Sequence, residues 1–292
     1  MTTAGELRSG KGHRDENFPV ASRLIDARHR AIILAFYEFV RVADDIADHA
    51  TLAPDRKLVL LDRLEASLLG TSEADPEGVR LRHVIAERGL SARHAQDLLA
   101  AFRLDVTQLR YANWDELMHY CSLSAMPVGR YVLDVHGESR ATWPASDAIC
   151  AALQIINHIQ DCREDYRNLD RVYVPLDAMA AAGTSVAALG EAQSSPQLLT
   201  CLHKLAARTA GLLRDGYPLP DQIKDFRLSL EISVIHTLAD KLVATLMVRD
   251  PLRDKVHHKS LGFAGVGVLG VLKGLRRRLG RRAAASPEHQ GA

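Results

Sequence analysis

Cysteine is scarce in this chain, and its spacing excludes several kinds of site. Only four of the 292 residues are cysteine, at positions 121, 150, 162 and 201. They lie too far apart for a CxxC pair or a zinc ribbon, and they are too few for a disulfide scaffold in a chain of this length. The sequence therefore favours a protein of a reducing compartment, and we expect it in the cytoplasm.

An excess of charge of one sign and a long apolar run are also missing. The chain has 37 basic and 36 acidic residues, and its basic residues show no interleaved aromatic pattern before the C-terminus, so nothing indicates nucleic-acid binding. The longest weakly apolar run, residues 262–272, is shorter than the ~20 residues that span a bilayer. Residues 1–18 contain no apolar segment of a signal peptide. We expect neither secretion nor membrane insertion.

Alternating strand patterns and a Gly-rich nicotinamide fingerprint are absent as well, whereas apolar residues recur at helical spacing almost throughout. One extended piece is expected, at residues 171–175, where β-branched residues precede a proline. We predict an all-α helical bundle with a central site, formed by one domain over residues 1–260 and followed by a tail over 261–292. The predicted helices cover residues 22–49, 55–69, 75–88, 92–111, 114–137, 146–167, 196–214, 221–249 and 252–260.

Two of these helices carry carboxylates four residues apart. Asp44 and Asp48 form one pair, and Asp161 and Asp165 form the other. Because side chains at i and i+4 share a helix face, each pair directs two negative charges to one place. A solvent-exposed helix end would explain one such pair, but both pairs stand beside apolar runs. Buried carboxylates need cations, and an all-oxygen site favours Mg²⁺, or Mn²⁺ in its place, and phosphate chemistry.

Other polar residues extend both pairs into stripes. Tyr37 and Arg41 precede the first pair at helical spacing, and Asn157 precedes the second, with Gln154 one turn earlier. We expect His158 to point away from the second stripe. Further along the surrounding helices, Tyr120, Ser124 and Gly129 are predicted to line the cavity or to allow close packing beside it, and Pro127 is predicted to kink its helix.

The segments YEFVRVADDIAD and NHIQDCREDYRNLDRVYVP resemble the two aspartate-rich signatures of the squalene and phytoene synthase family. The resemblance covers roughly residues 11–250. It implies the fold of the class I isoprenoid synthases. Three further segments, GKGHRDENFPVAS, FRLDVTQLRYANWDELMHYC and SAMPVGRYVLDVHGE, are similar to the branch that converts presqualene diphosphate to hydroxysqualene on the way to squalene and hopanoids. Pathway enzymes upstream and downstream are then expected partners.

The resemblance also implies roles for individual residues. Mg²⁺ would be held by Asp44 and Asp48 from one side and by Asn157, Asp161 and Asp165 from the other. Four residues would contact the substrate or its diphosphate, namely Asn17, Arg41, Arg171 and Tyr173. Tyr37 would lie near the leaving group or the developing cation. A carbocation reaction that ends in water capture needs no NADPH.

Two positions near the second signature depart from the pattern of the family. Gln160 stands where many members have arginine, which removes one positive charge near the diphosphate, and Asp170 stands in place of a glycine. Two alternative functions stay open. One is a head-to-head synthase that makes presqualene diphosphate, squalene or phytoene, and the other is a non-catalytic assembly factor with the same fold.

The C-terminal tail combines a modest apolar stretch with six basic residues between positions 273 and 282. It is either a disordered basic tail or an attachment to anionic lipid, in which each basic residue contributes about 1 kcal/mol. We favour the second interpretation, which would place the protein peripherally on the inner face of the cytoplasmic membrane.

Overall fold

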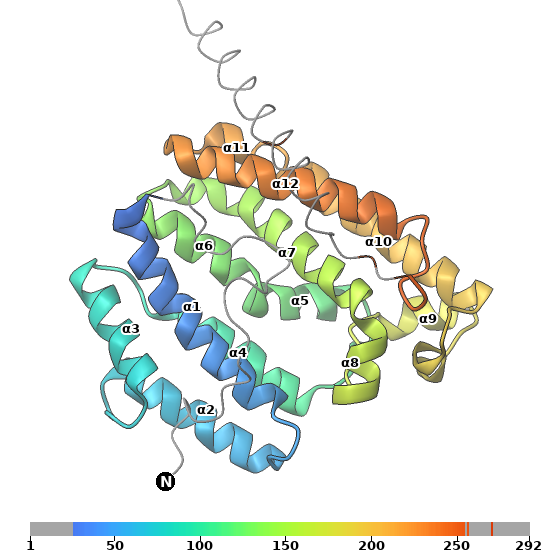
Figure 1. Ribbon diagram of the computed structural model, residues 1–292, viewed down its shortest axis with the longest axis horizontal. Helices are drawn as coiled ribbons and strands as arrows, with labels where there is room; N and C mark the ends of the chain where they lie inside the picture. The colour runs from blue at the N-terminus through green and yellow to red at the C-terminus, as the bar shows by residue number, and fades with distance from the viewer. Residues whose placement is uncertain (1–25, 255, 257–269, 271–292) are drawn as a thin grey trace, which may run out of the picture.

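The computed structural model describes residues 26–254, 256 and 270, and it confirms the predicted all-α fold (Figure 1). In the described residues twelve α-helices surround a central space, and no strand is present. Their bounds are α1 Ala27–Asp48, α2 Pro54–Leu69, α3 Pro76–Glu87, α4 Arg93–Thr107, α5 Trp114–Ser124, α6 Met126–Val135, α7 Trp143–Gln160, α8 Cys162–Leu169, α9 Leu176–Ala181, α10 Pro196–Gly216, α11 Leu219–Gln222 and α12 Phe226–Leu246. None of the helices in this part of the chain is long and apolar enough to cross a membrane.

Three helices that the sequence predicts as continuous are interrupted, among them the helix predicted over 221–249, in which residues 223–225 separate α11 from α12. The helix predicted over 114–137 is broken at Ala125, where φ is −123° and ψ is −45°, so that α5 ends and α6 starts with Pro127 in its first turn. The helix predicted over 146–167 bends at Asp161 into α7 and α8. Helical periodicity continues across the breaks at Ala125 and Asp161, and it cannot reveal them. Another prediction, a helix over 252–260, is wrong over its described part, because residues 251–254 form turns and a bend.

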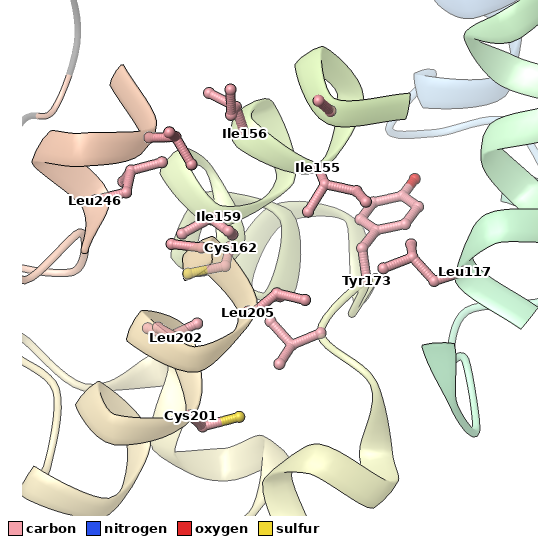
Figure 2. Close-up of a cluster of buried hydrophobic side chains, with 14 of the residues drawn as sticks. Leu117, Ile155, Ile156, Ile159, Cys162, Tyr173, Cys201, Leu202, Leu205 and Leu246 are labelled. Atoms are coloured by element: carbon pink, nitrogen blue, oxygen red, sulfur yellow. The ribbon is translucent and has the colours of Figure 1, made fainter. Parts of the chain in front are cut away.

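The core is centred on α7, which packs along α10 and α6. Figure 2 shows isoleucines of α7 facing leucines of α10 and α12 in one buried cluster. Ile155, Ile156 and Ile159 are fully buried, as is Leu202 on the facing helix α10. Burying one such side chain contributes roughly 1.5–3 kcal/mol. This packing fixes the helix that carries the second polar stripe.

A second core lies under α1, where the helix packs against α3 and α4. Phe39, Val42 and Ile46 are completely buried on that side of α1. The helix starts at Asp26, whose side chain accepts a hydrogen bond from the Arg28 backbone N–H. Its opposite side is thereby turned toward α7, with which it encloses the centre of the molecule (Figure 1).

The segment that follows α8 is extended, as predicted for residues 171–175. Val172 forms an isolated parallel bridge with Arg110, and its backbone N–H donates to Leu109 O at 2.9 Å. The turn into this segment is made by Asp170 at φ 52°. That left-handed conformation explains why glycine suits the position, and aspartate is among the few other residues that adopt it readily.

Part of the sequence interpretation lies outside the described residues. This applies to Asn17, to the N-terminal HRDENF segment and to most of the predicted tail. Gly270 is an exception, because it is buried and helical. A Cβ at this glycine would lie 2.6 Å from Val234 Cα, so the backbone at Gly270 packs directly on α12.

Candidate active site

A cavity of about 540 Å³ occupies the centre of the bundle. Most of its wall is apolar, and this part is formed by α1, α4, α6, α7, α11 and α12, with Phe36, Leu153 and Ile232 as examples. Most of the charged and hydrogen-bonding side chains belong to its other end, and one further buried carboxylate, Glu231 of α12, stands next to Ile232 in the wall. The cavity therefore has the shape and chemistry for a hydrocarbon ligand with a polar group at one end.

The C-terminal half of α1 supplies the first polar set. Tyr37, Arg41, Asp44 and Asp48 all line the cavity, as their helical spacing predicts. Arg41 is held in place by two carboxylates, since its Nη1 lies 2.7 Å from Asp44 Oδ2 and its Nη2 lies 2.9 Å from Asp45 Oδ1. Asp45 is buried behind Arg41 and does not line the cavity. It orients the arginine toward the site.

The end of α7 and the start of α8 supply the second set. Asn157, Asp161 and Asp165 line the same cavity, although the helix bends at Asp161. The bend preserves helical hydrogen bonds, because the Asp161 N–H donates to Asn157 O at 2.9 Å and the Asp165 N–H donates to Asp161 O at 2.8 Å. The two aspartate pairs, which are 117 positions apart in the sequence (161 minus 44), thus meet at one end of one cavity.

The carboxylates at this end carry more negative charge than their surroundings compensate. Burial, followed by the nearby charge of Asp48, raises the pKa of Asp44 to about 7. Burial, followed by the charges of Asp161 and Asp48, raises the pKa of Asp165 to about 8. Carboxyl groups with such pKa values bind protons at neutral pH, and a cation of higher charge would displace those protons.

Arg171 ties the two sides of the polar end together. Its Nη1 donates to Asp48 Oδ1, its Nη2 donates to Ala47 O at 3.0 Å, and its Nε donates to Asp105 O at 3.0 Å. Despite its burial, its pKa is raised by Tyr173, Asp105 and Asp48. It remains a cation, and it lines the cavity beside the aspartates.

Asp105 on α4 is the centre of a buried polar network. Its Oδ1 accepts a hydrogen bond from Tyr173 Oη at 2.7 Å, and its Oδ2 accepts one from Tyr120 Oη at 3.0 Å. Burial nevertheless raises its pKa to about 6. The ring of Tyr173 also stacks on His158 with centroids 3.6 Å apart. The network holds three aromatic rings beside the charged end of the cavity.

The structure brings together nearly all the residues that the sequence singles out. Every described member of the predicted site lines the cavity, namely Tyr37, Arg41, Asp44, Asp48, Asn157, Asp161, Asp165, Arg171 and Tyr173. Tyr120, Ser124 and Gly129 line it too, as expected. His158 does not point away, because it also lines the cavity, and its Nε2 lies 3.1 Å from Gln154 Nε2. Gln160 is buried outside the cavity, where its Nε2 donates to Val256 O.

Sequence reasoning missed Asp105 and Asp45. Asp105 continues the stripe of buried residues that α4 forms with Leu98, Ala101 and Phe102. A carboxylate at the buried position of an amphipathic helix is a signal that could have found it. Asp45 stands next to Asp44 in the sequence. Its spacing does not show whether it is an exposed carboxylate or one that orients Arg41.

The donor set at the polar end fits Mg²⁺. It consists of carboxylate and amide oxygens from two sides, with no thiol among the described lining residues that face them. No three of the described acidic, histidine or cysteine side chains converge closely enough to enclose an ion by themselves. Mg²⁺ commonly takes one or two carboxylates, several waters and substrate phosphate oxygens, so a split set of this kind suits it.

Comparison with known proteins agrees with the geometry. The model of the family described as squalene/phytoene synthase matches residues 12–260. A hydroxysqualene synthase of Rhodopseudomonas palustris is 59% identical over 98% of this chain and 99% of its own length, and one of Sinorhizobium fredii is 58% identical over 96% and 97%. The crystal structure of the squalene synthase HpnC from Alicyclobacillus acidocaldarius superposes with a TM-score of 0.71 at 26% identity, covering 83% of this chain and 91% of that one.

Proposed function

Since this chain belongs to the squalene/phytoene synthase family, we propose that it converts presqualene diphosphate to hydroxysqualene and diphosphate with the help of Mg²⁺. The chain is an isoprenoid synthase, and its cavity has room for a prenyl diphosphate. The observation that carries the proposal is the meeting of two aspartate pairs at one end of an apolar cavity. A diphosphate would occupy the charged end and the hydrocarbon would occupy the rest.

The side chains at the charged end have two proposed roles, to hold the metal and to add positive charge. Asp44 and Asp48 on one side, and Asn157, Asp161 and Asp165 on the other, would hold the metal. Bound there, Mg²⁺ supplies positive charge that stabilises the departing diphosphate. Arg41 and Arg171 add two cations, and both are oriented in advance by carboxylates. The protein therefore prepares the site before the negative charge of the leaving group develops.

The apolar part of the cavity protects the carbocation. Its walls exclude bulk water, so that rearrangement precedes capture by a nucleophile. Tyr120 and Tyr173 also line the cavity, and both donate hydrogen bonds to Asp105, which fixes their rings in its wall. Water is the final nucleophile in the proposed reaction, and no reductant takes part.

The proposal is tested by product analysis. Purified full-length protein is incubated with Mg²⁺ and without NADPH, once with presqualene diphosphate and once with farnesyl diphosphate, in ¹⁸O-labelled water. We expect an alcohol that carries the label from presqualene diphosphate, and no product from farnesyl diphosphate. Squalene that forms only in a parallel incubation with NADPH, or turnover of farnesyl diphosphate alone, would instead identify a head-to-head synthase. No turnover of either substrate would favour the non-catalytic alternative.

A further inference from the structure

A lysine of α2 is bonded to the helix that carries the first aspartate pair. Lys57 lies near the start of α2, and its Nζ donates a hydrogen bond to Ala47 O at 2.7 Å. Ala47 directly precedes Asp48, the last residue of α1. The contact therefore places a positive charge beside the charged end of the cavity, and the reaction proposed above gives this charge no role.

Arg171 bonds the same backbone carbonyl. Its Nη2 donates to Ala47 O at 3.0 Å, so this oxygen accepts hydrogen bonds from two cationic side chains. Lys57 Nζ and Arg171 Nη2 can lie no farther apart than these two bonds laid end to end. Two positive charges from distant parts of the chain thus meet at the end of α1.

The two cations repel each other, and the protein compensates for this only in part. Burial, followed by the charge of Arg171, lowers the pKa of Lys57, whereas the charge of Asp48 acts in the opposite direction. Asp48 is bonded to Arg171 and is also a proposed metal ligand. Lys57 forms no ion pair of its own with any described residue. An anion beside both cations would be attracted by each of them.

The two cations differ in their access to the cavity and to solvent. Arg171 lines the cavity and is buried, and the Asp48 side chain that it bonds also lines the cavity and is 41% exposed. Lys57 is half-buried and lies outside the cavity wall. Its ammonium group has donors besides the one that bonds Ala47 O. Together they line a path from the charged end to the surface.

From these contacts we propose that Lys57 and Arg171 form a two-cation site that binds the diphosphate at the rim of the cavity, after its bond to carbon has broken. A diphosphate has acceptor oxygens on both phosphorus atoms, so it can bond both side chains at once. The bond to Ala47 O orients the lysine before the ligand arrives. The inference rests on the proposed function, because it concerns the leaving group of that reaction.

The alternative role for Lys57 is to cap α1 and nothing more. Basic side chains commonly bond the last carbonyls of a helix, and such a cap stabilises the helix whether or not a ligand is bound. A cap does not depend on the charge of the ligand. A residue that binds diphosphate through its charge makes the affinity depend on ionic strength, because salt screens the attraction. The dependence of binding on salt therefore separates the two roles.

The experiment measures the affinity of the full-length protein for inorganic diphosphate by calorimetry, with Mg²⁺ present and over a series of salt concentrations. The melting temperature without ligand is recorded for every variant. Lys57→Met removes the charge and keeps an unbranched side chain, and Lys57→Arg keeps the charge. Lys241→Met is the matched control, because Lys241 is an exposed lysine of α12 that does not line the cavity.

We expect Lys57→Met to weaken diphosphate binding about fivefold to tenfold, the effect of losing one charge-assisted hydrogen bond. The affinity of this variant should also fall less steeply with added salt than that of the wild type, since one of the screened charges is gone. Lys57→Arg should stay within about twofold of the wild type, because it keeps both the charge and a donor. Lys241→Met should match the wild type in affinity and in salt dependence.

Two results would overturn the inference while the proposed function stands. The first is wild-type diphosphate affinity in Lys57→Met, with or without a lower melting temperature, which would leave the lysine as a helix cap. The second is weaker binding with the salt dependence of the wild type, which would attribute the loss to a distorted site and not to the missing charge. Wild-type protein that binds no diphosphate in the presence of Mg²⁺ would instead contradict the proposed function itself.

Discussion

Asp48, the last residue of α1, accepts a hydrogen bond from Arg171, which lies just after α8. The pair joins the two halves of the site before any ligand binds. Arg171 also bonds two backbone carbonyls, one on α1 and one on α4, so its guanidinium is held by three acceptors on two helices. Its position depends on the planar fork of the group as much as on its charge.

Replacing Arg171 with lysine should therefore destabilise the protein although the charge is kept. A lysine cannot make three directed hydrogen bonds from one plane, and we expect the free energy of unfolding in urea to fall by about 2 kcal/mol. Arg80→Lys is the control, because Arg80 pairs with Glu38 on the surface and such pairs contribute about 1 kcal/mol or less. Equal losses in the two variants would contradict the role given to Arg171.

Asp44→Asn and Asp161→Asn should each lower turnover by about a hundredfold or more, since each replaces one of the proposed metal ligands. Both proteins should stay folded, because the change relieves repulsion between carboxylates and opens no cavity. Steady-state kinetics across a Mg²⁺ titration, together with thermal melting, makes the measurement. Asp62→Asn, at an exposed carboxylate, is the control. Wild-type activity of either variant at saturating Mg²⁺ would remove the metal assignment.

The stability of the metal-free protein should depend on pH through Asp44 and Asp165. Their folded-state pKa values, about 7 and about 8, lie above the 3.8 of an ordinary aspartate. The folded protein then binds more protons than the unfolded chain, and its free energy of unfolding falls as the pH rises from about 4 to about 8. Urea denaturation over this range should show a shallower decline for Asp165→Asn and for wild type with Mg²⁺. Identical slopes in all three samples would contradict the raised pKa values.

Gly129→Ala should destabilise the protein by about 1–3 kcal/mol through overpacking. The new Cβ would lie 2.5 Å from Cys150 Sγ and 2.6 Å from Ser146 Oγ, both in the cavity wall. Cys150→Ala in the same chain should restore part of the loss. Gly211→Ala is the matched control, because Arg214 Nη2 at 3.6 Å is the nearest atom to its Cβ, and alanine favours a helix over glycine by about 1 kcal/mol. A stable Gly129→Ala protein would show that α6 and α7 can separate.

The aspartate pairs and the helical fold could be predicted because both depend on periodicity. Four-residue spacing places Asp44 and Asp48 on one face whatever surrounds them, and the same holds for Asn157 and Asp161. Spacing along one helix cannot show that two helices face each other. The expectation that the two helices face each other came instead from burial, because carboxylates buried beside apolar runs need cations between them.

Other parts of the site depend on tertiary contacts that leave no local pattern. Arg171 and Tyr173 follow a helix in an extended segment, and only the family resemblance pointed to them. Asp105 is a lone carboxylate whose partners come from two other elements. The bend at Asp161 was missed because the hydrogen bonds around it stay helical. For Arg171 and Asp105, the chain segments that supply the partners are distant in the sequence.

The bond between Asp48 and Arg171 spans 123 positions of the chain, and the cavity wall also includes residues of α12 such as Ile232. A growing chain emerges from its N-terminus, so the α1 carboxylates are made long before their partners. Contacts of this range close large loops and form late in folding. The charged end is therefore complete in sequence once residue 173 has been made, whereas the apolar wall requires α12 as well. A nascent chain that has not yet added α12 lacks one wall, and it has no enclosed space in which a carbocation could be protected from solvent.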